Sequence, residues 1–368
     1  MLFYDTSKRQ EFDQITTEFE SCNRGIEYCY LISFLTNITE LDLSENKISD
    51  ISSISKLINM KQLCLSSNCI NNISALQSLP YLTHLGLGQN KLTSYTLALP
   101  NLILLSLEYN ILQDKSGLQY SPKLENLYLS ETETTDLRSI PHQLFGVKDL
   151  GLSNNNILDI TYISNFIDLK YLTLSYNEQL QNIEPLKFCT QLTELYLYST
   201  NVADIWPLQF LKNLKTLNIS QTQVIDLHPL QYIYQLENIS AFRVRIIDIS
   251  PLSNLIQLKD LVLTNNKITN VDTLKHHKNF SQYELSVQQV PTTDQLKFYS
   301  KILSVHSSHK QIRKIKALSA EKRVSKFKES MIRQREYIKL QINEQIRVIN
   351  MKIEIWAQFI QDSNADYQ

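Results

Sequence analysis

One leucine position recurs along most of the chain and constrains its fold more than any other feature. A step of 22 residues, give or take two, separates Leu41, Leu63, Leu85, Leu105, Leu127, Leu150, Leu172, Leu195, Leu217, Ile239 and Leu261. Each period repeats the frame LxxLxLxxNxI. A fixed period of this length indicates a solenoid, because one unit alone buries too little apolar surface and must stack on its neighbours.

The first full unit, "ELDLSENKISDISSISKLINM", contains two different periodicities. Leu41 and Leu43 alternate with polar residues, which is typical of a strand with one buried face. Ile51, Ile54 and Leu57 then return at spacings of three, which indicates a helical turn. Stacked units would place the strands in a parallel sheet, about 4.8 Å apart.

A column of asparagines follows the strand positions, where the chain must bend. It comprises Asn46, Asn68, Asn90, Asn110, Asn155, Asn177 and Asn266. Backbone groups freed at a buried bend need partners, and a side-chain amide supplies both a donor and an acceptor. We expect the hydroxyls of Thr132, Thr200 and Thr222 to do this more weakly, and Val244 not at all.

A second polar column lies nine residues after each leading Leu or Ile. It comprises Asp50, Asp114, Asp136, Asp159, Asp204, Asp226 and Asp248, with Asn72 and Asn270 at the same place. The carboxylates could form a cation ladder, but hard cations need several oxygen ligands at once and no second ligand column accompanies them. Capping of the following turn is the favoured interpretation. Prolines at intervals of 22, at Pro185, Pro207, Pro229 and Pro251, suit the first position of short outer helical turns.

The units "NVADIWPLQFLKNLKTLNIS" and "RIIDISPLSNLIQLKDLVLT" resemble leucine-rich repeats. They are similar to the 22-residue subclass shared by the regulatory subunit of protein phosphatase 1 and the bacterial internalins. The resemblance covers eleven units over residues 41–282 and implies an α/β repeat solenoid, a horseshoe with a parallel β-sheet on its concave face. Members of such a class share a framework, and each binds its own partner through residues that the framework leaves free.

The segments that flank the repeats have different predicted roles. Residues 1–40 are expected to form an N-terminal cap with a degenerate repeat, in which Phe12, Ile15 and Phe19 have helical spacing. Residues 283–291 are expected to form a closing strand. Residues 292–368 carry 15 basic and 8 acidic side chains, against 21 and 29 in residues 1–291, and no Pro or Gly interrupts them. They predict a long, basic, amphipathic α-helix.

Three interpretations of this predicted helix stay open. Its charges could be a solvated face. Its apolar stripe within residues 338–360 could support self-association as a coiled coil: Ile338, Ile342, Ile346, Ile349, Ile353, Trp356 and Ile360. The basic tract over residues 310–335 could bind calmodulin, an anionic membrane surface or nucleic acid.

Composition and motifs point away from secretion, membrane insertion and catalysis. The chain shows no secretory signal and no transmembrane segment, and its five scattered cysteines indicate a reduced, cytoplasmic protein. Gly86 and Gly88 lack the third glycine of a phosphate-binding loop, and His276 and His277 lack ligand companions. We therefore expect a non-catalytic protein with no cofactor, no metal site and no small-molecule substrate.

Side chains that flank the strand leucines are expected to point into the concave face. They are small and polar in the early units, and aromatic residues replace them from the fourth unit onward, with Glu108 nearby. Tyrosine is common in this chain, with 19 copies, and it favours strands, which is the competing explanation. Exposed Tyr and Arg are also enriched at binding hot spots. The predicted partner-binding residues are Tyr109, Tyr128, Tyr171, Tyr176, Glu194, Tyr196, Tyr198, Phe242 and Arg243.

The function that these features predict is a protein–protein interaction scaffold that holds a protein partner in its concave face. A regulatory subunit of a protein phosphatase is an alternative that the resemblance allows. The other alternative is a protein whose basic tail binds calmodulin, membrane or nucleic acid.

Overall fold

The computed structural model describes residues 17–268, 270–277 and 282–284 of the chain. The chain divides into two units, Met1–Val290 and Pro291–Gln368, and all described residues lie in the first. The predicted helix over residues 292–368, with its apolar stripe and its basic tract, lies outside the described residues. Residues 285–291 of the predicted closing strand lie outside them as well.

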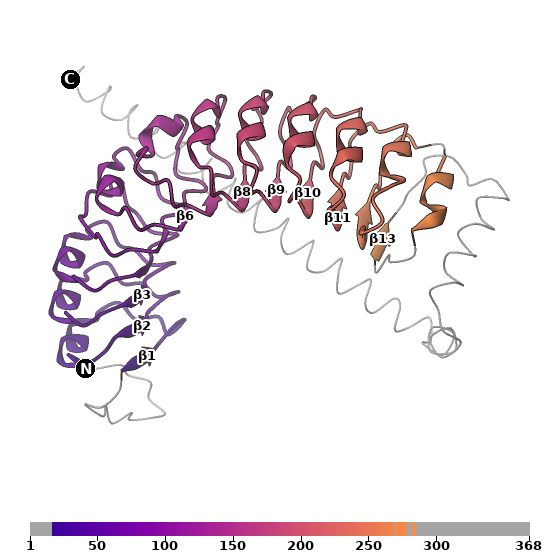
Figure 1. Ribbon diagram of the computed structural model, residues 1–368. Helices are drawn as coiled ribbons and strands as arrows, with labels where there is room; N and C mark the ends of the chain where they lie inside the picture. Colours follow the sequence, from indigo (N-terminus) through magenta and orange to yellow (C-terminus); the bar gives the residue numbers. More distant parts are fainter. Residues whose placement is uncertain (1–16, 269, 278–281, 285–368) are drawn as a thin grey trace, which may run out of the picture. The chain divides into compact units, whose positions relative to one another are not determined.

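The described residues form one parallel sheet whose 13 strands follow one another in chain order (Figure 1). Each strand has three residues, and the leading Leu or Ile is the central residue of the strand in all eleven predicted units. The strands are β1 (Glu18–Glu20), β2 (Glu40–Asp42), β3 (Gln62–Cys64), β4 (His84–Gly86), β5 (Leu104–Ser106), β6 (Asn126–Tyr128), β7 (Asp149–Gly151), β8 (Tyr171–Thr173), β9 (Glu194–Tyr196), β10 (Thr216–Asn218), β11 (Asn238–Ser240), β12 (Asp260–Val262) and β13 (Gln282–Glu284).

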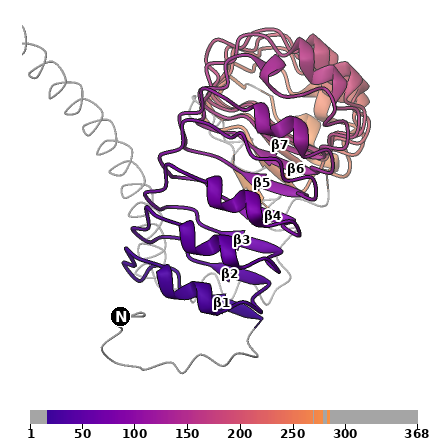
Figure 2. The same cartoon turned by 90° about the vertical axis from the view of Figure 1, so that its left-hand side faces the viewer.

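Short 3-10 helices lie on the opposite side of the solenoid from the strands (Figures 1 and 2). They are η1 (Tyr30–Phe34), η2 (Ser52–Lys56), η3 (Ser74–Ser78), η4 (Ser116–Tyr120), η5 (Leu137–Ser139), η6 (Thr161–Asn165), η7 (Glu184–Phe188), η8 (Trp206–Phe210), η9 (His228–Tyr232), η10 (Ser250–Leu252) and η11 (Asp272–His276). Each of the four predicted prolines lies in the first turn of its helix, η7 to η10, as the sequence predicts.

The apolar core fills the space between the sheet and the outer helices. Leu41 and Leu43 are buried on the strand side, and Ile51, Ile54 and Leu57 are buried in and around η2. Cys189 is also buried, at the core position that the repeat assigns to it. The residues with strand periodicity and those with helical periodicity therefore line opposite sides of one core.

The asparagine column satisfies backbone groups at the bend, as predicted, and it does so across two units. In Asn68, the amide Nδ2 donates to the carbonyls of Leu43 and Leu65, at 2.9 and 3.0 Å. Its Oδ1 accepts a hydrogen bond from the backbone N–H of Ile48 at 2.9 Å. Threonine is a partial substitute, because the Thr200 hydroxyl donates only to the carbonyl of Leu197 in its own unit.

One unit departs from the pattern, and a glycine accommodates the change. Only 20 residues separate Leu85 from Leu105, and no helix forms between β4 and β5. The outer part of this unit, which contains Leu97, is an extended segment. Its backbone at Leu97 lies directly against η4. A Cβ atom at Gly117, in η4, would lie 2.7 Å from the backbone nitrogen of Leu97.

The two ends of the described sheet differ in part from the sequence expectation. Phe19 lies in strand β1, so its helical spacing with Phe12 and Ile15 was misleading at this residue. Strand β1 pairs in parallel with β2, with Phe19 beside Leu41. At the other end, β13 begins at Gln282 and pairs with β12.

Replacing Leu174 by alanine should lower the free energy of unfolding by about 2 to 5 kcal/mol, because Leu174 is fully buried and the cavity would not close. Neighbouring units should lose protection too, since the interfaces between units carry stability. Urea unfolding and amide hydrogen exchange measure the two effects. Leu158→Ala is the control, because that leucine is 62% exposed. Equal urea midpoints for both variants would contradict the core position of Leu174.

Replacing Gly117 by alanine should destabilise the protein by about 1 to 3 kcal/mol, because the added methyl group overlaps backbone atoms that a side-chain rotation cannot move. Gly146→Ala is the matched control, since the nearest atom to a Cβ there is the Leu124 carbonyl oxygen at 3.8 Å. Thermal unfolding of the two variants gives the comparison. If Gly117→Ala unfolds at the same temperature as the wild type, the extended segment at Leu97 is not held against η4.

Candidate functional site

The concave side of the sheet is formed by alternate residues of the strands. The central residue of each strand from β2 to β12 is buried, and the first and third residues are more accessible in most strands. Parallel pairing places equivalent residues of neighbouring units side by side, so that Tyr171 lies beside Glu194 and Thr173 beside Tyr196. A residue's place in its unit therefore decides whether it reaches the concave side.

A residue with left-handed backbone follows four positions after the leading Leu or Ile. Its φ lies between 51° and 58° in most units and reaches 60° at Tyr176. Tyr109, Tyr176 and Arg243 of the predicted site occupy this position, where the two tyrosines are 49% and 42% exposed. The conformation recurs from unit to unit, whatever the residue, and so belongs to the framework rather than to a particular site.

Four of the predicted residues gather over strands β6 to β9. The rings of Tyr171 and Tyr196 lie 5.4 Å apart between centroids, and the Tyr196 hydroxyl donates to Glu194 Oε2 at 2.8 Å. Tyr128 lies over Gly151, because a Cβ atom at that glycine would be 2.9 Å from its ring carbon Cδ1. Gly151 therefore leaves the space that the Tyr128 ring uses.

The other predicted residues form smaller groups. Tyr176 and Tyr198 pack edge to face, with ring centroids 5.0 Å apart, at the turns that follow β8 and β9. The guanidinium of Arg243 lies 5.1 Å from the ring centroid of Phe242, beyond β11. Tyr109 follows β5. The structure thus brings the residues of β6 to β9 together, while Tyr109, Phe242 and Arg243 lie to either side of them.

Asp149 joins this group, although sequence reasoning missed it. It is the first residue of β7, lies between Asn126 and Tyr171 in the sheet register, and accepts a hydrogen bond from the Asn126 amide. The sequence could have identified Asp149 by its position, because it comes immediately before Leu150 as Glu194 comes immediately before Leu195.

Partial burial governs the electrostatics of the group. Removal from water raises the pKa of the Glu108 and Asp149 carboxyl groups. Removal from water also raises the pKa of the Tyr128 and Tyr171 phenols, and nearby carboxylates raise them further. For Tyr196 the same two causes act, the hydrogen-bonded carboxylate being that of Glu194. All these shifts disfavour negative charge on this surface.

Toward the N-terminus the same face is a groove with a small-residue floor. Cys64 and Gly86 lie in its lining, and Glu18, Glu20, Glu40 and Asp42 provide four carboxylates. The volume of this groove is about 610 Å³. The early units therefore offer an open acidic channel, and the middle units offer aromatic rings.

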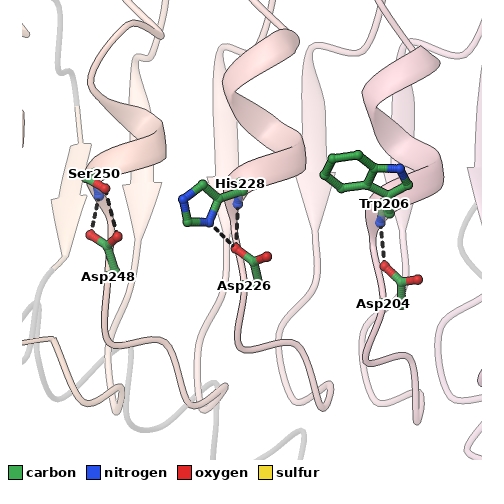
Figure 3. A network of polar contacts seen from close by, with 6 residues as sticks. All are labelled: Asp204, Trp206, Asp226, His228, Asp248 and Ser250. Atoms are coloured by element: carbon green, nitrogen blue, oxygen red, sulfur yellow. Dashed lines mark hydrogen bonds and ion pairs between the residues drawn. The ribbon is translucent and has the colours of Figure 1, made fainter.

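The aspartate column caps the outer helices, as the sequence predicts. Figure 3 shows three such caps, in which Asp204, Asp226 and Asp248 each accept the backbone N–H two residues later at 2.8 Å. Asn182 makes the same contact with Glu184 at 2.9 Å. The sequence register missed Asn182, because one extra residue follows Leu172 and places it ten positions later instead of nine.

The part of the chain that the structure describes contains neither a metal-binding group nor a membrane-spanning helix. No group of three or more His, Cys, Asp or Glu side chains there has an arrangement that could hold a metal ion. Over the same residues, no helix combines the length and the apolar character needed to cross a membrane. All five cysteines are free thiols.

Comparison with known proteins agrees with this geometry. A family model described as "Leucine Rich repeats (2 copies)" matches residues 36–81. No curated protein matches the sequence. An internalin crystal structure from Listeria monocytogenes is 30% identical, with 74% of this chain and 81% of that chain covered and a TM-score of 0.69. The solenoid thus belongs to the class of repeat proteins that are built around a curved parallel sheet. The chain belongs to the leucine-rich repeat family.

More distant structures share the fold. A leucine-rich repeat protein of Leptospira interrogans is 20% identical, with 80% of this chain and 95% of that chain covered and a TM-score of 0.62. The ectodomain of a plant membrane receptor kinase from Arabidopsis thaliana, solved in complex with Casparian strip integrity factor 2, is 20% identical. That match covers 71% of this chain and 37% of the receptor chain, with a TM-score of 0.53.

The aspartate caps predict an acid-dependent part of the stability. The backbone N–H of Ser250 holds the pKa of Asp248 below its usual range, so its stabilisation is present above the unfolded pKa of about 3.9 and is lost as the pH falls through the lower folded value. Asp248→Asn should keep the cap, as Asn72 and Asn270 do, and lose this dependence. In urea unfolding between pH 7 and pH 2, the difference between wild type and variant should shrink at acid pH. If the difference in stability between wild type and Asp248→Asn stays constant with pH, the Asp248 carboxylate does not provide this stabilisation.

Proposed function

We propose that this protein is a non-catalytic interaction scaffold that binds a partner protein on the concave side of the sheet, over strands β5 to β11. The observation that carries the proposal is the set of large aromatic side chains at positions where other units have small residues. In the column of third strand residues, Tyr128 and Tyr196 stand where Gly86, Gly151 and Thr173 stand in neighbouring units. The framework thus folds without an aromatic residue there.

Strand propensity does not account for three of the six predicted tyrosines. Tyr109, Tyr176 and Tyr198 lie after the strands, not in them, and two of the three occupy left-handed backbone that favours smaller residues. A role in binding accounts for them better, because tyrosine offers a large contact area with few rotatable bonds.

The pairing of the rings supports the same proposal. Tyr171 packs on Tyr196, and Tyr176 packs on Tyr198. Side chains that are already held by neighbours lose less conformational entropy when a partner arrives, and such preorganisation increases affinity. The aromatic surface therefore has the properties of a binding hot spot.

The remaining expectations about partners and location stay proposals. Self-association through residues 338–360 and binding by the basic tract concern residues outside those described. No described residue favours the phosphatase alternative. The five free thiols support the cytoplasmic location proposed from the sequence.

The proposal predicts the effect of a triple variant of the full chain that combines Tyr171→Ala, Tyr196→Ala and Tyr198→Ala. Affinity purification from cells should recover about tenfold less partner, or less still, with this variant. The reason is that each hot-spot truncation weakens binding by about 2 kcal/mol or more. Quantitative mass spectrometry of the recovered proteins measures the effect. Urea unfolding of the purified variant checks that it remains folded.

A matched control is available on the outer helices. Phe188, Phe210 and Tyr232 are the last residues of η7, η8 and η9, and they are 55%, 49% and 38% exposed. Their combined replacement by alanine removes three exposed aromatic rings from the opposite side of the same units. Unchanged recovery with the concave variant, or equal loss with both variants, would exclude the concave tyrosines as the specific binding surface.

A further inference from the structure

Six side chains of the middle units form a mixed surface that we name the aromatic–acidic cluster: Tyr128, Tyr171 and Tyr196 with Glu108, Asp149 and Glu194. The sheet register joins four neighbouring strands in it, because Tyr128 is the last residue of β6 and Asp149, Tyr171 and Glu194 are the first residues of β7, β8 and β9. Neighbouring strands lie about 4.8 Å apart, so the cluster extends about 14 Å from β6 to β9, and one extended side chain of a partner contacts members on neighbouring strands.

The carboxylates of this cluster form no ion pair with another described residue. Among the described residues, neither Glu108 nor Asp149 nor Glu194 has a Lys, Arg or His nitrogen within 4.0 Å. Lys170 and Lys148 lower the pKa of Asp149 from a distance without pairing with it, and Lys148 pairs instead with Glu125 at 2.8 Å. The negative charges of Glu194, Glu108 and Asp149 all raise the pKa of Tyr171, so the three acids act on the same ring.

The arrangement is unfavourable for the protein alone. Burial raises the pKa of Glu108 and of Asp149, so the ionised form that prevails at neutral pH is the disfavoured one. A carboxylate held partly out of water without a counter-charge lowers stability. An arriving cation would remove that penalty and would gain from the three ring faces as well.

Acidic residues also outnumber basic ones at the strand positions of the other units. At the first and third positions of strands β1 to β12, the sequence places seven carboxylates: Glu18, Glu20, Glu40, Asp42, Asp149, Glu194 and Asp260. The same positions hold no lysine and no arginine, and His84 is their single histidine. The groove over the early units and the aromatic–acidic cluster thus attract the same sign of charge.

We infer that the partner is a basic protein segment that inserts an arginine or lysine side chain into the aromatic–acidic cluster. Arginine suits it best, because a planar guanidinium stacks on tyrosine rings while it forms paired hydrogen bonds with a carboxylate. Further basic residues of the segment follow the acidic groove toward β1. This inference rests on the proposed function, since it names the chemistry of the partner for the same surface.

The test uses the full chain and two defined probes. One is a short fluorescent peptide of alternating arginine and glycine, and the other is its citrulline analogue, which keeps the shape of arginine and removes its charge. Fluorescence anisotropy should show the arginine peptide binding about tenfold or more tightly than the citrulline peptide. Equal binding of the two peptides, or no binding of the arginine peptide, would overturn the inference.

Charge-neutral variants then locate the binding. Combined Glu108→Gln, Asp149→Asn and Glu194→Gln should weaken binding of the arginine peptide by about tenfold or more. The control variant combines Asp168→Asn, Glu178→Gln and Glu184→Gln, which removes the same charge from three exposed residues outside the concave strand positions. Equal affinities for the two variants would place the peptide elsewhere and overturn the inference.

Folding stability provides a readout that does not depend on any ligand. Glu108→Gln alone should raise the urea midpoint at pH 7, because it removes a carboxylate whose ionised form the fold disfavours. A lowered midpoint would contradict the premise that this charge is uncompensated.

The two proposals fail in different ways. If partner recovery from cells falls with the tyrosine variant but not with the charge-neutral variant, the concave scaffold stands and the basic partner does not. If recovery falls with neither, the proposed function itself is excluded.

Discussion

The structure depends on a side-chain amide that completes the hydrogen bonds of a buried bend. At each bend the chain turns out of the sheet through a left-handed residue, and the buried backbone groups around the bend need hydrogen-bond partners. The amide of Asn177 donates to the carbonyls of Leu152 and Leu174 and accepts the N–H groups of Asn155 and Ile157. Each such asparagine therefore joins its own unit to the preceding one, and the leucine core can close without unpaired backbone groups.

This division of roles leaves the concave side free of the residues that hold the repeat together. The amides, the buried leucines and the capping aspartates hold the repeat, and none of them reaches the open face of the sheet. Residues there vary between Gly, Ser, Thr and Tyr with no change in the strand pattern. The aromatic–acidic cluster lies on this free surface, where partial burial raises the pKa of Glu108 and Asp149 and so disfavours their ionised forms. Such a local conflict between stability and composition is expected at a functional surface.

The sequence predicted the regular parts and missed those that depend on unit length. The strands, the amide ladder, the aspartate caps and the helical prolines all follow from a period that every unit repeats. Asn182 was missed because one inserted residue displaces it, and Phe19 was misinterpreted because a single terminal unit carries too few repeated positions to set its register. The missing helix between β4 and β5 coincides with Ser94, which stands where other units have a capping Asp or Asn.

The sequence by itself determined the solenoid, the inner and outer sides of each unit, and the candidates for the concave face, because buried leucines must recur at the period of the repeat. Only the tertiary structure decided which of those candidates meet. Tyr171 contacts Tyr196 across 25 positions of sequence, and Tyr128 uses the space above Gly151 in the next unit. Such contacts depend on the lateral register of parallel strands and on side-chain volume, and neither is encoded in the spacing within a single unit.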